Sequence, residues 1–232
     1  MPPLPQELMA AFLAGTAGGP KRERTRAQLL YAAVQAFSAR GLAAATMQEV
    51  AQAAGVTTAT LYNHFGTKDV LVRELAQAIA VTFSAAIDAS YAHVTEGAER
   101  MAIGQRRYVR LAGESPAWTG MLLEMFVAAP EVAEAIRDYQ LGDLRLGIRQ
   151  KAFRVPSEAV ALDVINGVAL QAMRRAAAGE APANHDVAVA TVVLRALGVP
   201  AEEAAAIAKR PLPPLVGPAP VELAARGKRR TS

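Results

Sequence analysis

An all-helical fold is predicted for this chain of 232 residues by three features of its sequence. Apolar residues make up 52% of the chain with alanine prominent, and aromatic residues only 5%, a balance that favours closely packed helices over aromatic-rich strands. Apolar residues recur at helical spacing through successive segments, and prolines and glycines fall between those segments. The length allows one large or two small domains with a sizeable core.

The first predicted helix lies in the segment TRAQLLYAAVQAFSARG. Leu29, Leu30, Val34 and Phe37 fall on one stripe of that helix, as expected for a face that packs against a core. Gly41 follows the last apolar position and predicts the C-terminal cap.

Two short helices joined by a tight turn are predicted next. Thr46 marks the start of the first, because Glu49 lies three residues further on in the capping-box pattern. Gly55 ends it and allows the left-handed backbone conformation that the turn requires. The second helix, TTATLYNHF, ends at Gly66, and Thr67 caps a long helix that begins TKDVLVRELAQAIAVTFSAAI. The two short helices form a helix-turn-helix pattern.

Polar side chains crowd the second short helix, where packing alone does not call for them. Thr58, Tyr62, Asn63 and His64 all lie within it, and the basic run KRERTR precedes the whole region. Residues 21–81 carry a net charge of +3, residues 82–208 carry −3 and residues 209–232 carry +5. A basic cluster of this kind suits either an ordinary solvated surface or contact with phosphates.

The segment TMQEVAQAAGVTTATLYNHFGTKDVL resembles the DNA-binding signature of the TetR family of one-component bacterial regulators, and the similarity is strong over about residues 22–75. The resemblance implies an N-terminal three-helix DNA-binding domain with a helix-turn-helix, joined by a long helix to a C-terminal helical ligand-binding and dimerisation domain. The expected boundaries are 21–68 for the first domain and 69–208 for the second, with disordered segments at 1–20 and 209–232.

The function that the resemblance implies is sequence-specific regulation of transcription. A homodimeric repressor, released from a palindromic operator by a small and largely apolar ligand, is the main expectation. A ligand-responsive activator is the alternative within that class. A helical small-molecule carrier or enzyme is the alternative from a different class.

The resemblance places the DNA contacts on the two short helices and on the basic arm before them: Thr46, Gln48, Thr57, Thr58, Ala59, Thr60, Tyr62, Asn63, His64, Lys68, Lys21, Arg22 and Arg24. Threonine methyls and Ala59 suit thymine methyl groups, and Asn63 suits an adenine edge. Tyr62, His64 and Lys68 suit phosphates. The family often has a basic residue near Thr58, and the arm, together with Arg26, is expected to restore that positive charge.

Helices are predicted through the rest of the chain near 96–113, 116–128, 131–153, 157–178, 185–197 and 201–208. Bulky flexible and aromatic side chains concentrate in the middle helices, which is typical of an adaptable apolar pocket, although an ordinary packed core is the alternative. The predicted ligand-binding residues are Tyr108, Trp118, Met121, Met125, Phe126 and Tyr139, with Arg106, Arg107 and Glu124 as neighbouring polar groups.

The segments EAVALDVINGVALQAM and DVAVATVVLRALG are apolar on so many sides that burial from several directions is expected. A single domain can bury them internally, but the resemblance assigns the last two helices to a four-helix interface between two copies of the chain. The predicted interface residues are Val164, Ile165, Val168, Val189, Val192, Val193 and Leu197.

Catalytic and metal-binding functions find no support in the sequence. The absence of cysteine excludes disulfides and thiolate ligands, and His64, His93 and His185 are scattered without a catalytic or metal-binding motif. No catalytic residue, cofactor or metal site is therefore predicted, and the expected partners are double-stranded DNA, a small-molecule effector and a second copy of the chain. No apolar stretch of about 20 residues is recognised, so we expect a cytoplasmic protein without a membrane span.

Overall fold

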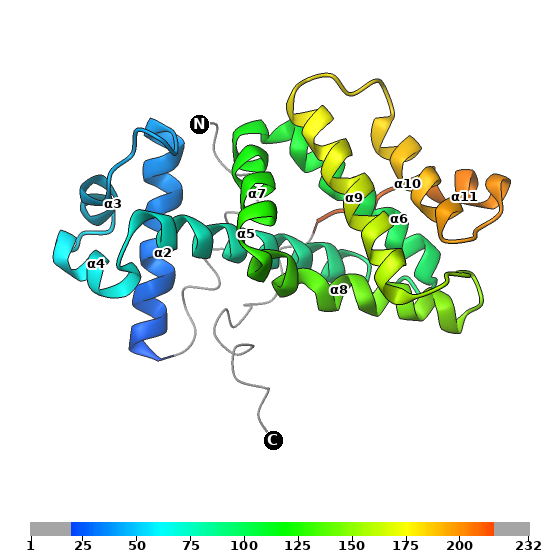
Figure 1. The fold of residues 1–232 in the computed structure, drawn as a ribbon, viewed down its shortest axis with the longest axis horizontal. Coiled ribbons are helices and arrows are strands. Elements are labelled where there is room, and N and C mark those ends of the chain that lie inside the picture. The colour runs from blue at the N-terminus through cyan, green and yellow to red at the C-terminus, as the bar shows by residue number, and fades with distance from the viewer. Residues whose placement is uncertain (1–19, 216–232) are drawn as a thin grey trace. The chain divides into compact units, whose positions relative to one another are not determined.

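The computed structural model describes residues 20–215 of the chain. Within that range it contains ten α-helices and no β-strand, so the predicted all-helical fold is confirmed (Figure 1). The chain divides into two compact units, one ending at Phe83 and the other beginning at Ser84. This division falls inside a continuous helix, α5 (Lys68–Ser90), rather than at its start, where the sequence predicts the domain boundary.

The first unit comprises α2 (Lys21–Arg40), α3 (Met47–Ala53), α4 (Thr58–Phe65) and the first part of α5. Helices α3 and α4 have only 7 and 8 residues, too few to be stable in isolation, so packing must hold them. The side chains that do so are apolar and buried: Leu29, Val34, Phe37, Val50, Leu61, Phe65, Leu71 and Leu75. Each such side chain contributes about 1.5–3 kcal/mol on burial.

Side-chain caps start both short helices, and the sequence predicts the first of them, Thr46. The Thr46 hydroxyl accepts a hydrogen bond from the backbone N–H of Glu49 at 3.2 Å, and the Glu49 carboxylate accepts one from the backbone N–H of Thr46 at 2.9 Å. Thr57 caps α4 by accepting from the backbone N–H of Thr60 at 3.2 Å. Gly55, at a φ of 67°, provides the left-handed conformation between α3 and α4.

The second unit is built around α6 (Gly97–Glu114), which contacts every later helix. Those helices are α7 (Pro116–Ala128), α8 (Pro130–Arg149), α9 (Glu158–Ala177), α10 (His185–Ala196) and α11 (Ala201–Ala208). Pro116 and Pro130 occupy the first residues of α7 and α8, where a missing backbone N–H costs nothing.

Helix α8 ends at Arg149 rather than continuing to residue 153 as the sequence predicts. Lys151 turns the chain with a φ of 61°, and the ring of Phe153 folds back onto Gly147. A β-carbon on Gly147 would collide with that ring, and one on Gly97 would collide with the backbone of Gly147. The two glycines therefore allow α6 and α8 to approach closely and make room for Phe153.

Helix α5 is long and apolar enough to cross a membrane, judged by its length and its mean hydropathy of 1.6. The expectation that the chain has no such stretch is therefore wrong for this helix. About two thirds of it, 67%, is buried inside the protein, as is typical of the core helix of a globular domain. Among the other helices of residues 20–215, none meets the same test.

Candidate functional site

Helix α4 separates its side chains into a buried and an outward-facing set. Leu61 and Phe65 are buried, whereas Ala59 and Asn63 are exposed and the Tyr62 side chain is 48% exposed. Thr58, Thr60 and His64 are half-buried at the edges of the exposed face. Ala59, Tyr62 and Asn63, three of the residues predicted to contact DNA, thus share one accessible face because they recur at the three- and four-residue spacing of a helix.

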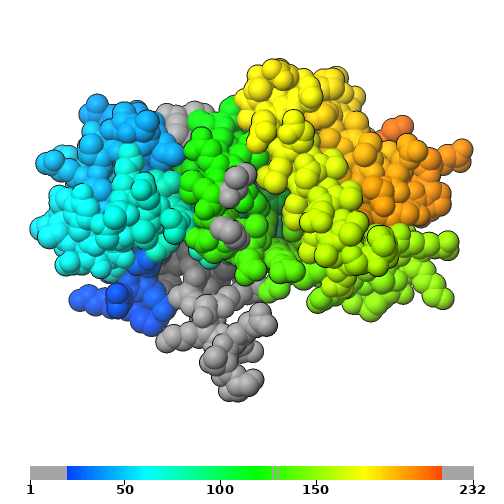
Figure 2. Space-filling view, in the orientation of Figure 1, coloured from blue at the N-terminus to red at the C-terminus, as the bar shows by residue number. Residues whose placement is uncertain are grey.

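Helix α3 adds the exposed Thr46 and Gln48 to this unit, and Figure 2 shows the surface of α3 and α4 in blue to cyan. The hydroxyls of Thr46, Thr57 and Thr60 are already engaged. Thr46 Oγ1 takes part in the capping box, and the hydroxyls of Thr57 and Thr60 lie 2.9 Å apart in a hydrogen bond. Their methyl groups, rather than their hydroxyls, are therefore the atoms best placed for contacts with bases.

Lys68 anchors the start of α5 to the segment before α3. Its ammonium group donates hydrogen bonds to the carbonyl oxygens of Ala43 at 3.2 Å and Ala45 at 2.6 Å. An ammonium group has three N–H donors, so one remains for a phosphate. Lys68 therefore has a structural role that the sequence does not predict, and it keeps one donor for the phosphate contact that the sequence does predict.

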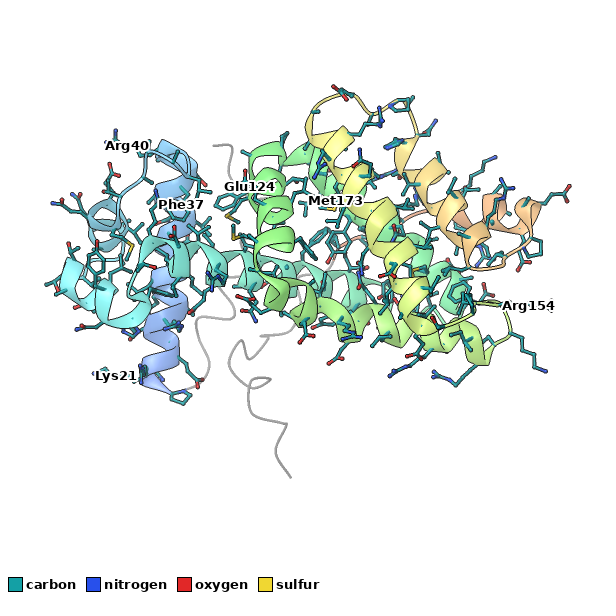
Figure 3. All side chains as sticks on the ribbon, viewed as in Figure 1. Lys21, Phe37, Arg40, Glu124, Arg154 and Met173 are labelled. Atoms are coloured by element: carbon teal, nitrogen blue, oxygen red, sulfur yellow. The ribbon has the colours of Figure 1, made fainter. Side chains whose placement is uncertain are left out.

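The basic arm forms the first turns of α2, where Lys21, Arg22 and Arg24 are exposed. Figure 3 shows Lys21 at the opposite end of α2 from Arg40. Arg26 differs from the expectation for the arm, because its Nε donates to Glu74 at 2.8 Å and its Nη1 donates to the carbonyl of His64 at 2.7 Å. Arg26 therefore stabilises the unit and is not available to DNA.

His64 lies beside this cationic cluster at the end of α4. Burial, together with the positive charges of Arg26 and Arg22, holds the pKa of His64 below its usual range. Its Nδ1 has no hydrogen-bond partner among the residues described. His64 is therefore uncharged at neutral pH, and any contact that it makes with a phosphate is a hydrogen bond rather than an ion pair.

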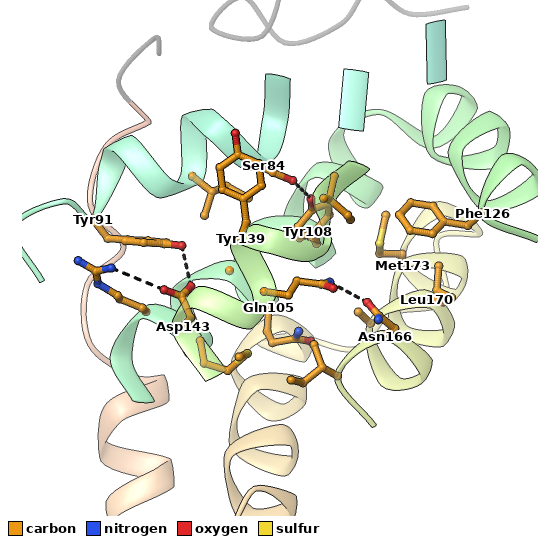
Figure 4. Close-up of a pocket in the computed structure, with 18 residues that line it drawn as sticks. Ser84, Tyr91, Gln105, Tyr108, Phe126, Tyr139, Asp143, Asn166, Leu170 and Met173 are labelled. Atoms are coloured by element: carbon orange, nitrogen blue, oxygen red, sulfur yellow. Dashed lines mark hydrogen bonds and ion pairs between the residues drawn. The ribbon is translucent and has the colours of Figure 1, made fainter. Parts of the chain in front are cut away.

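A pocket with a volume of about 60 Å³ lies in the second unit, between α5, α6, α7, α8 and α9 (Figure 4). A cavity needs about 10–15 Å³ to hold one water molecule, so this pocket has room for several waters or for one small organic molecule. Its apolar walls consist of Ile87, Met101, Phe126, Ile136, Ile165, Ala169, Leu170 and Met173.

One end of the pocket carries a polar cluster of buried Tyr91, buried Asp143 and half-buried Arg100. The Tyr91 hydroxyl donates to Asp143 Oδ2 at 2.7 Å, and Nη1 of Arg100 lies 3.7 Å from Asp143 Oδ1 (Figure 4). Burial raises the pKa of Asp143 to about 6, against the opposing effects of Tyr91 and Arg100. Burial also raises the pKa of Tyr91, so this phenol stays protonated and remains a donor.

Five further polar side chains in the wall of the same pocket differ in their hydrogen bonding. The hydroxyls of Ser84 and Tyr108 lie 2.6 Å apart, and Gln140 donates to Asn166 Oδ1 at 2.7 Å. The Gln105 side chain is different. It is only 4% exposed, and its Oε1 has no hydrogen-bond partner among residues 20–215.

The pocket includes half of the ligand-binding residues that the sequence predicts. Tyr108, Phe126 and Tyr139 line it, whereas Trp118 and Met121 are buried in the core away from it and Met125 is not part of its wall. Apart from Tyr108 and Tyr139, the polar residues of the wall are not predicted from the sequence. Arg100, Met101, Gly104, Gln105 and Tyr108 nevertheless recur along one face of α6, and that spacing is the signal that identifies them.

Arg106 and Arg107, predicted as polar groups near the ligand, point elsewhere. Nε of Arg106 donates to Asp186 at 3.0 Å and its Nη1 donates to the carbonyl of Arg210 at 2.6 Å, while Arg107 donates to the carbonyl of Pro213. Glu124 is exposed and does not line the pocket. These bonds also hold the described start of the C-terminal segment, for which the sequence predicts disorder, against α6.

The predicted dimer interface divides into buried and accessible residues. Val192 is 54% exposed on α10, and Val164 and Val168 on α9 are half-buried. Four of the seven lie inside the unit's own apolar clusters and do not reach its surface: Ile165, Val189, Val193 and Leu197. Val160, which the sequence does not predict as an interface residue, is 47% exposed on α9. The predicted or newly found apolar side chains that remain accessible on α9 and α10 are therefore Val160, Val164, Val168 and Val192.

Comparison with family models gives two matches. Residues 29–75 match the model described as bacterial regulatory proteins, tetR family. Residues 96–210 match the model described as tetracyclin repressor-like, C-terminal domain. The first range contains α3, α4 and the start of α5, and the second runs from the residue before α6 to the residues after α11.

Two characterised proteins illustrate the similarity. The HTH-type transcriptional repressor KstR2 of Rhodococcus jostii strain RHA1 is 26% identical over 147 residues, which span 56% of this chain and 68% of that protein. The HTH-type transcriptional regulator TtgR of Pseudomonas putida is 45% identical over 53 residues, or 23% of this chain. That second match covers only 25% of the length of TtgR.

Solved structures resemble the chain over most of its length. RolR in complex with resorcinol has a TM-score of 0.73 and 28% identity, covering 84% of this chain and 98% of RolR. FadR from Bacillus subtilis in complex with stearoyl-CoA has a TM-score of 0.58 and 18% identity, covering 73% of this chain and 96% of FadR. At that identity the likeness to FadR concerns the fold alone.

Proposed function

The chain belongs to the TetR family of bacterial DNA-binding transcriptional regulators, and we propose that it is a homodimeric cytoplasmic repressor that a small ligand releases from a palindromic operator. The observation that carries the proposal is the exposed face of α4, held by buried Leu61 and Phe65 in a small capped unit. The name of KstR2, a transcriptional repressor that is similar over 56% of this chain, supports repression rather than activation.

On this proposal α4 enters the major groove, where some of its outward side chains contact bases and others contact phosphates. Ala59 and the methyl group of Thr58 contact thymine methyls, and Asn63 pairs with an adenine edge. Tyr62, His64 and the remaining N–H of Lys68 hold phosphates, which positions the helix without reading the sequence. Gln48 of α3 and the exposed residues Lys21, Arg22 and Arg24 add contacts to the DNA backbone.

The proposed dimer uses the accessible apolar face of α9 and α10. Val192 and Val160 are more than two fifths exposed, which is unusual for valine, and Val164 and Val168 flank them on α9. Covering this face with the same face of a second copy removes it from water and produces a two-fold symmetric dimer. Two-fold symmetry places two α4 helices on the half-sites of a palindromic operator.

The proposed effector occupies the pocket of the second unit. Its mostly apolar walls and small volume favour a small, largely apolar molecule. The similarity to RolR, whose structure contains resorcinol, supports an effector of comparable size. Helix α5 provides a covalent route for release, because Ser84 and Ile87 near its end line the pocket and its first residue follows the turn after α4.

The energy needed for release is modest. A ligand that binds the DNA-free arrangement better by about 1–3 kcal/mol lowers operator affinity roughly 5- to 150-fold. Linkage then requires operator DNA to weaken ligand binding by the same factor, so the proposal predicts a reciprocal effect that can be measured from either side.

Fluorescence anisotropy with labelled DNA from the region flanking the chain's own gene tests this function, with a scrambled duplex of equal length as the control. We expect tighter binding to the genomic duplex, weakening on both duplexes as salt rises, and a stoichiometry of two chains per site. No binding to either duplex at low salt would contradict the proposal and would favour a carrier. Transcription that rises when the protein binds would instead identify an activator.

A further inference from the structure

The pocket has one charged cluster, in which the positive charge of Arg100 is paired with the negative charge of Asp143. Asp143 faces Arg100 through one carboxylate oxygen and Tyr91 through the other, while Asp88 lies near enough to raise the pKa of Asp143. Arg100 also donates to the carbonyl of Val94 at 2.7 Å, so its guanidinium is held in place. An anionic ligand would find no unmatched cation among the lining residues and would meet carboxylate charge, so the wall favours an uncharged ligand.

Gln105 supplies a second and independent feature. Gln105 lines the cavity, and its side-chain oxygen is buried without a hydrogen-bond partner in the described part of the chain. A buried acceptor left unpaired is unfavourable, and such groups are paired in the great majority of proteins. The hydrogen-bond partner that the Gln105 oxygen lacks is therefore a donor, an O–H or an N–H, which the molecule that occupies the pocket provides.

Size and shape restrict the class further. The volume of about 60 Å³ fits a molecule of one ring. Phe126, Leu170 and Met173 provide apolar and polarisable walls, which pack well against an aromatic ring. The polar groups at the Asp143 end offer further partners for ring substituents.

We propose that the pocket binds an uncharged single-ring compound carrying at least one hydroxyl group, and that this hydroxyl donates a hydrogen bond to Oε1 of Gln105. The proposal rests on the assignment of the pocket as the effector site and specifies the ligand class and the residue that reads it. Gln105 thereby selects for donors, and the Asp143 cluster selects against anions.

Calorimetry on the full chain with three probes tests the ligand class. Resorcinol carries hydroxyl donors, 1,3-difluorobenzene has nearly the same shape without a donor, and 3-hydroxybenzoate adds a negative charge. We expect resorcinol to bind at least about tenfold more tightly than either of the others, which corresponds to about 1.4 kcal/mol. Equal affinities for resorcinol and 1,3-difluorobenzene, tighter binding of the benzoate, or no binding of any probe at millimolar concentration would each overturn the proposal.

The variant Gln105→Met tests the residue, because methionine keeps the length of the side chain and removes the acceptor. We expect the affinity for resorcinol to fall about tenfold and that for 1,3-difluorobenzene to stay the same or rise. Gln35→Met, the same change at an exposed position of α2, is the matched control. Unchanged resorcinol affinity in Gln105→Met would remove Gln105 from the site.

DNA binding without ligand separates this proposal from the proposed function. If Gln105→Met binds operator DNA as the wild type does but is no longer released by resorcinol, both proposals stand. If the wild-type chain binds resorcinol selectively but no DNA, the ligand class stands and the regulatory function fails. The wild-type probe series remains decisive even where the variant does not fold.

Discussion

The guanidinium group of Arg26 lies over the ring of Phe65, with its central carbon 4.5 Å from the ring centroid. The same guanidinium pairs with Glu74 of α5 and donates to the carbonyl of His64 at the end of α4. One side chain of α2 therefore ties together α4 and α5. The stacking and the hydrogen bonds use the planar fork of arginine, which lysine cannot reproduce.

Replacing this arginine tests its structural role. Arg26→Met keeps the apolar stem, loses the hydrogen bonds and should lower the stability of the first unit by about 1–3 kcal/mol. Differential scanning calorimetry measures the effect. Arg22→Met is the control, since Arg22 is exposed and should affect the salt dependence of DNA binding without lowering Tm. An unchanged melting temperature for Arg26→Met would show that the contact is not stabilising.

Substitutions on α4 should distinguish side chains that contact bases from side chains that contact phosphates. Asn63→Ala should change the preference at one base pair by about 1–3 kcal/mol and leave affinity for scrambled DNA nearly unchanged. Tyr62→Phe, which removes only a hydroxyl from a half-exposed ring, should weaken binding to both duplexes equally. Binding to a set of operators with single base-pair changes distinguishes the two. A uniform loss for Asn63→Ala would place that residue among the phosphate contacts.

Two adjacent valines provide a matched test of the dimer interface. Val192 is 54% exposed and Val193 is 0% exposed, within the unit's own core. Val192→Glu should therefore give a folded monomer, whereas Val193→Glu should bury an unpaired charge and unfold the second unit. Sedimentation and circular dichroism report the two outcomes. A Val192→Glu variant that remains a dimer would refute the proposed face.

The pH dependence of stability should report Asp143. Its pKa is raised from 3.8 to about 6 by burial, so the folded chain binds its proton more tightly than the unfolded chain does. Stability from this group is therefore complete below about pH 4 and is lost as the pH rises to about 6, by roughly 3 kcal/mol at most. Asp143→Asn should flatten urea-unfolding stability over that range. A wild-type slope in the variant would assign the dependence to other groups.

Local signals in the sequence were sufficient to predict the helices and their limits. The capping box of Thr46 and Glu49, the glycine at position 55 and the prolines that begin α7 and α8 act within a few residues of the chain, so they do not depend on distant contacts. The outward face of α4 follows from helical spacing once its limits are known. The end of α8 was the exception, because the return of Phe153 onto Gly147 is a contact between side chain and helix that no local pattern signals.

Tertiary structure alone decided which polar residues meet and which apolar residues stay accessible. Tyr91, Asp143 and Arg100 come from three separate segments, and the packing of α6 among its neighbours leaves the Gln105 side-chain oxygen without a hydrogen-bond partner among residues 20–215. A helix as apolar as α10 has no polar face to set its rotation, so sequence alone does not distinguish Val192 from Val193. The packing of α10 against α6, α9 and α11 sets that rotation. As a result Val193 is buried and Val192 lies on the surface.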